Sequence, residues 1–146
     1  MQFETAKFGQ IEIDPECILL LPHGLIGFEQ HRHWVLLSDA ESDAVGWLQS
    51  LRDPETAFLV ATPQRFVPDY RVRVSREEFH TLPWSGEDKT IAVAIVNKQD
   101  DHFTMNLKSP VLINLDRCVG RQVVVLDDQP VQHALSAQPP LLRKSA

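Results

Sequence analysis

Residues 90–115 read TIAVAIVNKQDDHFTMNLKSPVLINL, and they carry the clearest signal of the fold class. Within it, residues 90–97, 103–107 and 111–115 are short runs rich in apolar and β-branched side chains, which is typical of strands. Asp100-Asp101 lies between the first two runs and favours a turn. Such short runs indicate neighbouring antiparallel strands, and they do not show the alternation of strands with helices that marks a parallel sheet.

The same pattern continues on both sides of this stretch. Further strands are expected at residues 3–8, 11–13, 34–37, 46–51, 57–61, 70–74 and 122–126. Turns are expected at Gly9-Gln10, in an acidic loop at residues 38–43, at residues 52–55 and at residues 117–120. The alternation of residues 70–74 places Arg71 and Arg73 on a solvent face. Turn signals every few residues predict a mainly antiparallel all-β domain, either a sandwich or a barrel.

One short helix is predicted after residue 74. Ser75 is followed three residues later by Glu78, a capping-box pattern that satisfies backbone donors at a helix start. Pro83 should end this helix near Leu82, because the residue before a proline avoids the helical conformation. Residues 1–135 then form one domain, and residues 136–146, which mix small, polar and proline residues, are expected to be a loosely ordered tail.

Composition limits the classes of function. The chain has 146 residues, 43% of them hydrophobic, and a net charge of −6. An acidic chain with scattered Lys and Arg residues is a poor binder of nucleic acid, whereas it suits a basic protein partner. The apolar runs are much shorter than the roughly 20 residues that span a bilayer. We therefore expect neither direct nucleic-acid binding nor a membrane span, and nothing demands more than a monomer.

Cys17 and Cys118 match no metal-binding or redox spacing. The simplest interpretation is a cytoplasmic protein with two reduced, mostly buried thiols. The sequence is also compatible with a single disulfide between them.

The histidines offer one alternative function. His31 and His33 flank Arg32, so both imidazoles would point to one face of a strand. Together with His23 they suggest a small β-barrel enzyme or a metal-binding protein, although a metal site needs a third and usually a fourth ligand. The acidic pairs are adjacent in sequence and would face opposite ways on a strand. Because no nucleophile motif or glycine-rich phosphate loop occurs, we expect no catalytic, cofactor or metal site.

Two segments combine glycine or proline with aromatic residues. Residues 22–28 read PHGLIGF, which predicts a turn with unusual backbone angles at Gly24 or Gly27 and with Phe28 anchored in the core. Residues 66–70 read FVPDY, which predicts a packed bend capped by Asp69. Either segment could instead present its side chains to a partner.

These segments belong to a larger pattern that resembles the FliW family of flagellar assembly factors. The motifs, in order, are FGQIEI (8–13), PHGLIGF (22–28), WLQS with AF (47–50, 57–58), PQRFVPDY (63–70), TMNLKSPV to Asn114 (104–114) and GRQ with VVL (120–126). Each motif alone is weak, but the six are collinear over residues 3–128. Ser109 replaces the usual alanine, and residues 80–89 and the tail lie outside the pattern.

The resemblance implies a compact β-barrel-like single domain with one or two short helices and without enzymatic activity. FliW-like proteins bind flagellin and also CsrA, a dimeric RNA-binding repressor of flagellin translation. Free FliW holds CsrA off the flagellin messenger, and newly made flagellin occupies FliW until it is secreted. The residues we nominate as protein-partner contacts are Phe28, Gln49, Phe66, Asp69, Tyr70 and Asn106.

Overall fold

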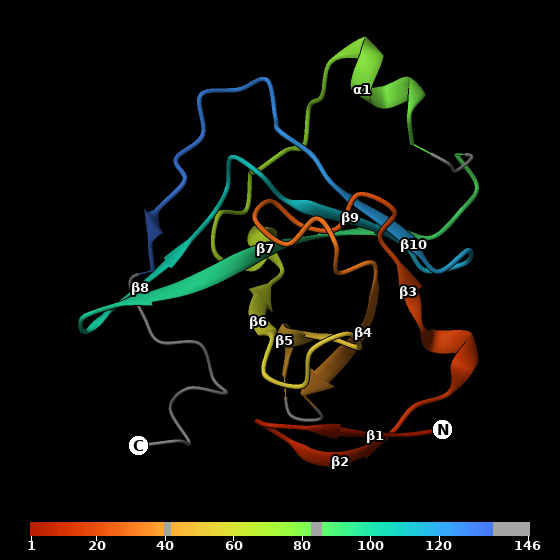
Figure 1. The fold of residues 1–146 in the computed structure, drawn as a ribbon. Coiled ribbons are helices and arrows are strands. Elements are labelled where there is room, and N and C mark those ends of the chain that lie inside the picture. Colours follow the sequence, from red (N-terminus) through yellow and green to blue (C-terminus); the bar gives the residue numbers. More distant parts are fainter. Residues whose placement is uncertain (40–41, 83–85, 136–146) are drawn as a thin grey trace.

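Short strands make up most of the chain (Figure 1), and the computed structural model describes residues 1–39, 42–82 and 86–135. The strands are β1 (Gln2–Thr5), β2 (Gly9–Glu12), β3 (Leu19–Leu20), β4 (His33–Asp39), β5 (Ser42–Ser50), β6 (Ala57–Ala61), β7 (Thr90–Gln99), β8 (His102–Met105), β9 (Val111–Asn114), β10 (Val119–Gln122) and β11 (His133–Ala134). The helical segments are the 3-10 turns η1 (Pro15–Cys17) and η2 (Pro63–Arg65) and the helix α1 (Arg76–His80). The predicted all-β class is confirmed. No helix in these ranges is long and apolar enough to cross a membrane.

Seven of the strands close into a barrel. The pairing runs β7–β6–β5–β4–β3–β10–β9, and β9 pairs back onto β7. The barrel pairs are antiparallel except β3–β10, which is parallel and meets through the single pair Leu20 and Val119. Of the two architectures left open by the turn spacing, the chain therefore adopts the barrel, which removes exposed sheet edges.

The long strand β7 holds three neighbours at once. Its residues 90–93 pair with β9, Ala94 and Ile95 pair with β6, and residues 96–99 pair with β8. The hairpin β1–β2 forms a separate small sheet, and β11 lies against β8. β7 therefore joins the barrel wall to the β8–β11 extension, which projects from the barrel in Figure 1.

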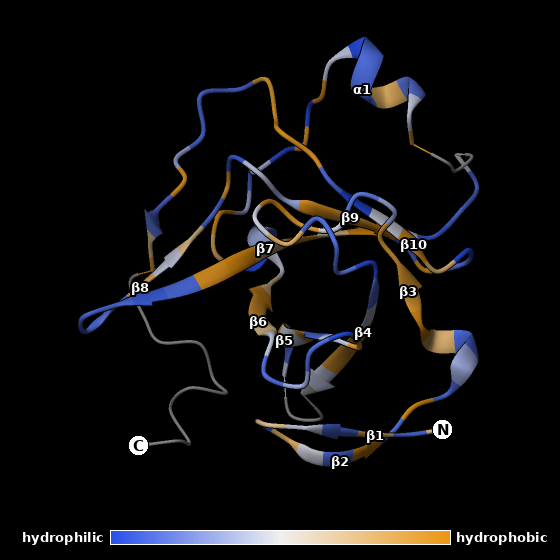
Figure 2. Ribbon diagram, in the orientation of Figure 1, coloured by the Kyte–Doolittle hydropathy of each residue, from blue (hydrophilic) through white to orange (hydrophobic). Residues whose placement is uncertain are grey.

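Alternation along β6 and β7 creates two cores. Val60, Val93 and Ile95 point into the barrel, whereas Leu59, Ala61, Ala94 and Val96 point to the opposite face. This follows from the two-residue period of a strand. Figure 2 shows the resulting hydrophobic colour along β6, β9 and the middle of β7.

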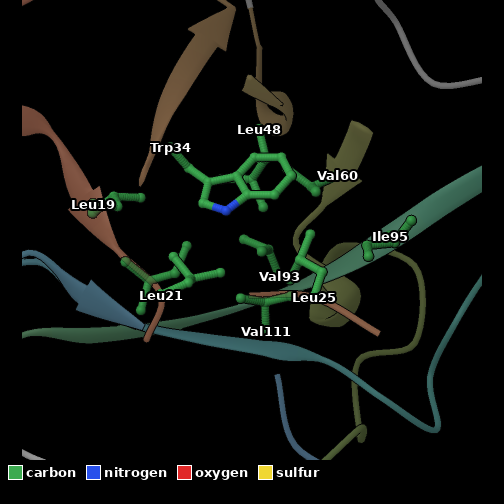
Figure 3. Close-up of a cluster of buried hydrophobic side chains, with 10 residues drawn as sticks. Leu19, Leu21, Leu25, Trp34, Leu48, Val60, Val93, Ile95 and Val111 are labelled. Carbon is green, nitrogen blue, oxygen red and sulfur yellow. The ribbon is translucent and has the colours of Figure 1, made fainter. Parts of the chain in front are cut away.

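Trp34 fills the inner core. Its indole is fully buried and projects into the barrel interior, where side chains from β3, β5, β6, β7 and β9 surround it (Figure 3). The indole Nε1 donates a hydrogen bond of 2.7 Å to the His31 carbonyl oxygen. A ring of this size buried in an apolar interior needs such a partner for its one polar atom.

The outer core is covered by the segment that follows η2. Tyr70 is buried there, and its hydroxyl donates a hydrogen bond of 2.6 Å to the Leu107 carbonyl oxygen. Phe66, Val67 and Val72 pack against the same core. Burial, with a smaller contribution from the negative charge of Asp127, raises the pKa of Tyr70 to about 12.

Several predicted local features are confirmed. The Ser75 hydroxyl accepts a hydrogen bond from the Glu78 amide at the start of α1. The hairpin of β5 and β6 and the turn at Asp100 form as expected. Gly24 and Gly27 both adopt positive φ angles, of +62° and +88°. Pro83, which was expected to end the helix, and the predicted tail at residues 136–146 lie outside the described ranges.

Several predicted bounds were wrong, and Gly9-Gln10, expected to form a turn, begins β2. β1 ends at Thr5, because the Thr5 hydroxyl accepts from the Phe8 amide and donates to the Gly9 carbonyl, which closes the turn earlier. The strand expected at residues 122–126 is β10, which begins at Val119 and ends at Gln122, since Asn114 Oδ1 accepts from two amides of the preceding turn. The expected acidic loop is shorter, because β4 and β5 extend into it.

Residues 70–74 are not a strand. Their burial alternates as predicted, with Arg71 and Arg73 exposed. However, the segment lies over the outer core without forming a ladder, and the Arg73 carbonyl accepts a single bond from the Leu126 amide.

The prediction that both cysteine thiols are mostly buried was wrong. Both cysteines are free, but Cys17 is exposed and Cys118 is only half-buried, because both lie in turns beside the β3–β10 seam.

The conformation of Gly24 gives a stability prediction. A Cβ at Gly24 would meet the Phe28 carbonyl oxygen and lie 2.7 Å from Glu29 Cα, whereas a Cβ at Gly27 would meet nothing within 4 Å. Gly24→Ala should lower the free energy of unfolding by about 2–4 kcal/mol. Gly27→Ala, which carries only the backbone strain, should cost about 1–2 kcal/mol. Urea denaturation measures both, and equal losses would contradict the packing of this turn.

Tyr70 gives a pH prediction, and it is the single tyrosine of the chain. An unfolded tyrosine loses its proton near pH 10, whereas folded Tyr70 should keep it until about pH 12. The unfolded state is therefore favoured as pH rises between these values, so stability present below pH 10 is lost up to about pH 12. Tyrosinate absorbance of the folded protein measures the midpoint.

Tyr70→Phe is the control for this titration. It should destabilise the protein by about 1–2 kcal/mol at neutral pH, because the Leu107 carbonyl loses its donor. The variant should also lose less stability than the wild type between pH 10 and 12. A folded-state midpoint near pH 10 would show that the hydroxyl is solvated.

Candidate functional site

The nominated residue Gln49 organises a turn inside the domain. It lies on β5 and is fully buried. Its Nε2 lies 2.9–3.3 Å from the carbonyl oxygens of Ser50, Asp53, Pro54 and Thr56. Its Oε1 has no hydrogen-bond partner among the described residues. The side-chain amide of Gln49 thus holds the β5–β6 turn together. Because Gln49 is fully buried, a partner cannot contact it.

Tyr70 and Asn106 also use their polar groups internally. Tyr70 is bonded to Leu107 as described above. Asn106 Oδ1 accepts hydrogen bonds from the amides of Lys108, at 3.1 Å, and Ser109, at 3.0 Å. This arrangement closes the bend between β8 and β9. Asn106 is half-buried, so part of its side chain still reaches the surface.

The remaining nominated residues are more accessible. Phe28 is half-buried, with its ring edge-on to His31 and Phe58 at centroid distances of 5.5 and 5.0 Å. Phe66 is half-buried against the outer core. Asp69 is exposed, and the bend it was expected to cap is instead closed by the Tyr70 amide, which donates to the Val67 carbonyl. Phe66 and Tyr70 share the outer core, Asp69 adjoins Tyr70, and Asn106 adjoins Leu107, which accepts the Tyr70 hydroxyl, so these four residues lie in one region. Phe28 and Gln49 lie apart from them, beside the inner core and in the β5–β6 turn, so the six residues do not form one site.

The turn at residues 22–28 presents an apolar side chain to solvent. The backbones of Leu25 and Phe28 bond to each other across it, which leaves Ile26 at the tip with 65% of its surface exposed. Gln122 Oε1 accepts from the Ile26 amide at 2.7 Å, and Glu29 Oε2 accepts from the Gly27 amide at 2.6 Å. Since both tip amides are held by side chains, the position of Ile26 is fixed.

Further apolar side chains surround the end of β10, next to this turn. Past the strand, Val123 and Val125 point inward, whereas Val124 and Leu126 are 51% and 64% exposed. An ion pair of 3.7 Å between Arg121 and Glu78 brings α1 to the same strand, and Phe79 on that helix is 61% exposed. We call Ile26, Phe79, Val124 and Leu126 the β10 apolar set.

Sequence reasoning missed this set, although a signal was available. The run Val123 to Leu126 alternates between buried and exposed apolar residues, so two of its four side chains had to face outward. Isolated exposed apolar residues are ordinary, but several around one strand mark a candidate interaction surface. The arrangement can bury apolar area against a partner.

The histidines of the alternative function are not brought together as a ligand set. His31 Nδ1 lies 2.9 Å from Ser50 Oγ, and only His33 belongs to a strand, so the two do not share a strand face as predicted. His23 is exposed in the turn before Gly24. Across residues 1–39, 42–82 and 86–135, no three His, Cys, Asp or Glu side chains are grouped closely enough to hold a metal ion.

Asp53, in the turn next to His31, has a pKa below its usual value. The Glu55 amide and the Thr56 hydroxyl both donate to its carboxylate, at 3.0 and 2.8 Å, which lowers the pKa of Asp53. His31 adds a smaller contribution in the same direction. The charge of Asp53 therefore stabilises the β5–β6 turn.

Comparison with known proteins identifies the family. The family model described as FliW protein matches residues 2–135. The flagellar assembly factor FliW of Bdellovibrio bacteriovorus is 36% identical over 130 residues, which cover 88% of this chain and 74% of the relative. That of Geobacter sulfurreducens is 34% identical over 127 residues, covering 86% and 79%. These relatives are named for assembly and not for a reaction.

A solved structure shows the same fold. The crystal structure of a flagellar assembly factor FliW superposes with a TM-score of 0.85 at 27% sequence identity. The match covers 94% of this chain and 98% of that chain. Both the barrel and its extensions are therefore shared, and the chain belongs to the FliW family of flagellar assembly factors.

Proposed function

We propose that this protein is a non-enzymatic regulator that binds flagellin and antagonises the translational repressor CsrA, and so couples flagellin synthesis to export. The observation that carries the proposal is the end-to-end match to a flagellar assembly factor, which spans 94% of the chain. Because the match covers nearly all of both chains, it supports extending the family's role to this chain. Its place of action would be the cytoplasm, where flagellin is made.

The chemistry of the described surface suits binding. The polar groups of Gln49 and Tyr70 are used inside the domain, so they support the fold that a partner would meet. The β10 apolar set offers the kind of side chain that the buried centre of a protein interface is made of. Phe28, Phe66, Asp69 and Asn106 stay candidate contacts at the edges of the shared motifs.

Charge supports CsrA as one of the partners. The chain carries 20 acidic and 14 basic residues, for a net charge of −6. A protein that binds RNA needs a positive surface to contact phosphates. Attraction between opposite charges speeds the encounter of the two proteins, and the same negative charge repels the messenger.

The proposed mechanism is an exchange of partners. When flagellin accumulates, it occupies this protein, and CsrA is free to repress translation. When flagellin leaves by secretion, the protein is released and removes CsrA from the messenger. The exchange requires only two binding equilibria, which the rigid barrel and its fixed loops can provide without chemistry.

Calorimetric titration of the purified chain with its cognate CsrA, and separately with its cognate flagellin, tests the proposal. We expect a saturable complex with each. Binding to neither partner would overturn the proposed function. Binding to flagellin without CsrA would reduce it to a flagellin chaperone.

The role of the β10 apolar set has its own test. Phe79→Ser with Leu126→Ser removes two exposed side chains and leaves the net charge unchanged, so we expect at least about a tenfold weaker affinity for one of the two partners. Val131→Ser is the matched control, because Val131 is similarly exposed, at 57%, but lies near β11. Unchanged titrations for both partners would show that the contact lies elsewhere.

A further inference from the structure

A pocket with a basic lining opens beside the start of β4. Its volume is about 560 Å³, and its lining residues are Gln30, Arg32, His33, Leu51 and Arg52. They come from two separate parts of the chain, the segment that leads into β4 and the turn that follows β5. Two guanidinium groups, one imidazole and one amide therefore share a pocket without any carboxylate in its lining.

The backbone of both arginines is held in place. The Arg32 carbonyl accepts from the Leu21 amide at 2.7 Å, and the neighbouring His33 carbonyl accepts from the Leu51 amide at 2.9 Å. On the other side of the pocket, the Arg52 amide donates to Ser50 Oγ at 3.1 Å. The two side chains thus start from fixed positions, which lowers the entropic cost of holding a ligand.

Acidic residues close to the arginines in sequence are engaged elsewhere. Glu29 accepts from the Gly27 amide, and Asp53 accepts from Glu55 and Thr56 within its own turn. The ion pairs of the described residues include neither Arg32 nor Arg52. Arg52 Nη2 reaches only Gln30 Oε1, at 3.5 Å. Although the protein has more acidic than basic residues, these two guanidinium groups have no carboxylate partner. They are therefore suited to bind an anionic ligand.

We propose that this pocket binds a compact oxyanion, a carboxylate or phosphate group held between Arg32 and Arg52, with His33 and Gln30 as further donors. Guanidinium groups match the two oxygens of such a group in a bidentate manner. The net charge of −6 disfavours an extended polyanion, whereas a single anionic group meets mainly the local positive field. The group could belong to a protein side chain or to a free phosphate, and the proposal does not depend on flagellin or CsrA.

Nuclear magnetic resonance titration of the ¹⁵N-labelled full chain tests the proposal. The probes are inorganic phosphate and the peptide N-acetyl-Ala-Glu-Ala amide, with N-acetyl-Ala-Gln-Ala amide as the uncharged peptide control. Sodium chloride holds the ionic strength constant, so that simple screening does not produce the shifts. We expect saturable shifts at residues 30–33 and 51–52 with at least one anionic probe, and none with the uncharged peptide. Tighter binding of phosphate or of the acidic peptide identifies the source of the anion.

A charge-matched pair of variants decides whether the pocket is responsible. Arg32→Gln with Arg52→Gln should weaken binding at least about tenfold, because both guanidinium groups are lost. Arg71→Gln with Arg73→Gln removes the same charge from two exposed arginines outside the pocket lining and should leave binding unchanged. Equal weakening in both variants, or no saturable shift with either anionic probe, would overturn the proposal. The dispersion of each variant's spectrum shows that it is folded.

Discussion

The pairing of β9 back onto β7 is the contact on which the rest of the domain depends. It closes the barrel, and the long strand β7 pairs with β9, β6 and β8 in turn along its ten residues. Closure gives β7 one face toward the barrel interior and one toward the outer core. Trp34 fills the first, and the segment that contains Tyr70 covers the second. A chain of this size gains two buried apolar layers from a single continuous sheet.

Closure also determines which residues are left to meet a partner. Inside the shared motifs, side chains such as Gln49 and Asn106 fix turns that the barrel needs. We propose that the surface for binding lies on segments that project from the barrel wall. The turn that carries Ile26, the helix with Phe79 and the end of β10 are joined by Gln122 and Arg121. The shared motifs therefore hold both kinds of residue: Gln49 and Asn106 support the barrel, whereas Ile26, Val124 and Leu126 are exposed.

Local patterns in the sequence were sufficient for much of the fold. Turn residues separated the strands, Ser75 and Glu78 marked the helix start, and Gly24 and Gly27 marked the unusual turn. Features set by distant partners could not be predicted in this way. Residues 70–74 alternate like a strand, but their position is set by the Tyr70 bond to Leu107, 37 residues away. The basic pocket is lined by residues from 30–33 and from 51–52, and no spacing in the sequence predicts that these residues lie together.

We propose that this barrel acts by exchanging partners. The most direct measurement follows the binding of cognate CsrA to the flagellin leader RNA by fluorescence anisotropy, first with this protein added and then with flagellin added as well. We expect the protein to release CsrA from the RNA and an excess of flagellin to restore the CsrA–RNA complex. A CsrA–RNA complex that is unaffected by saturating amounts of the protein would contradict it.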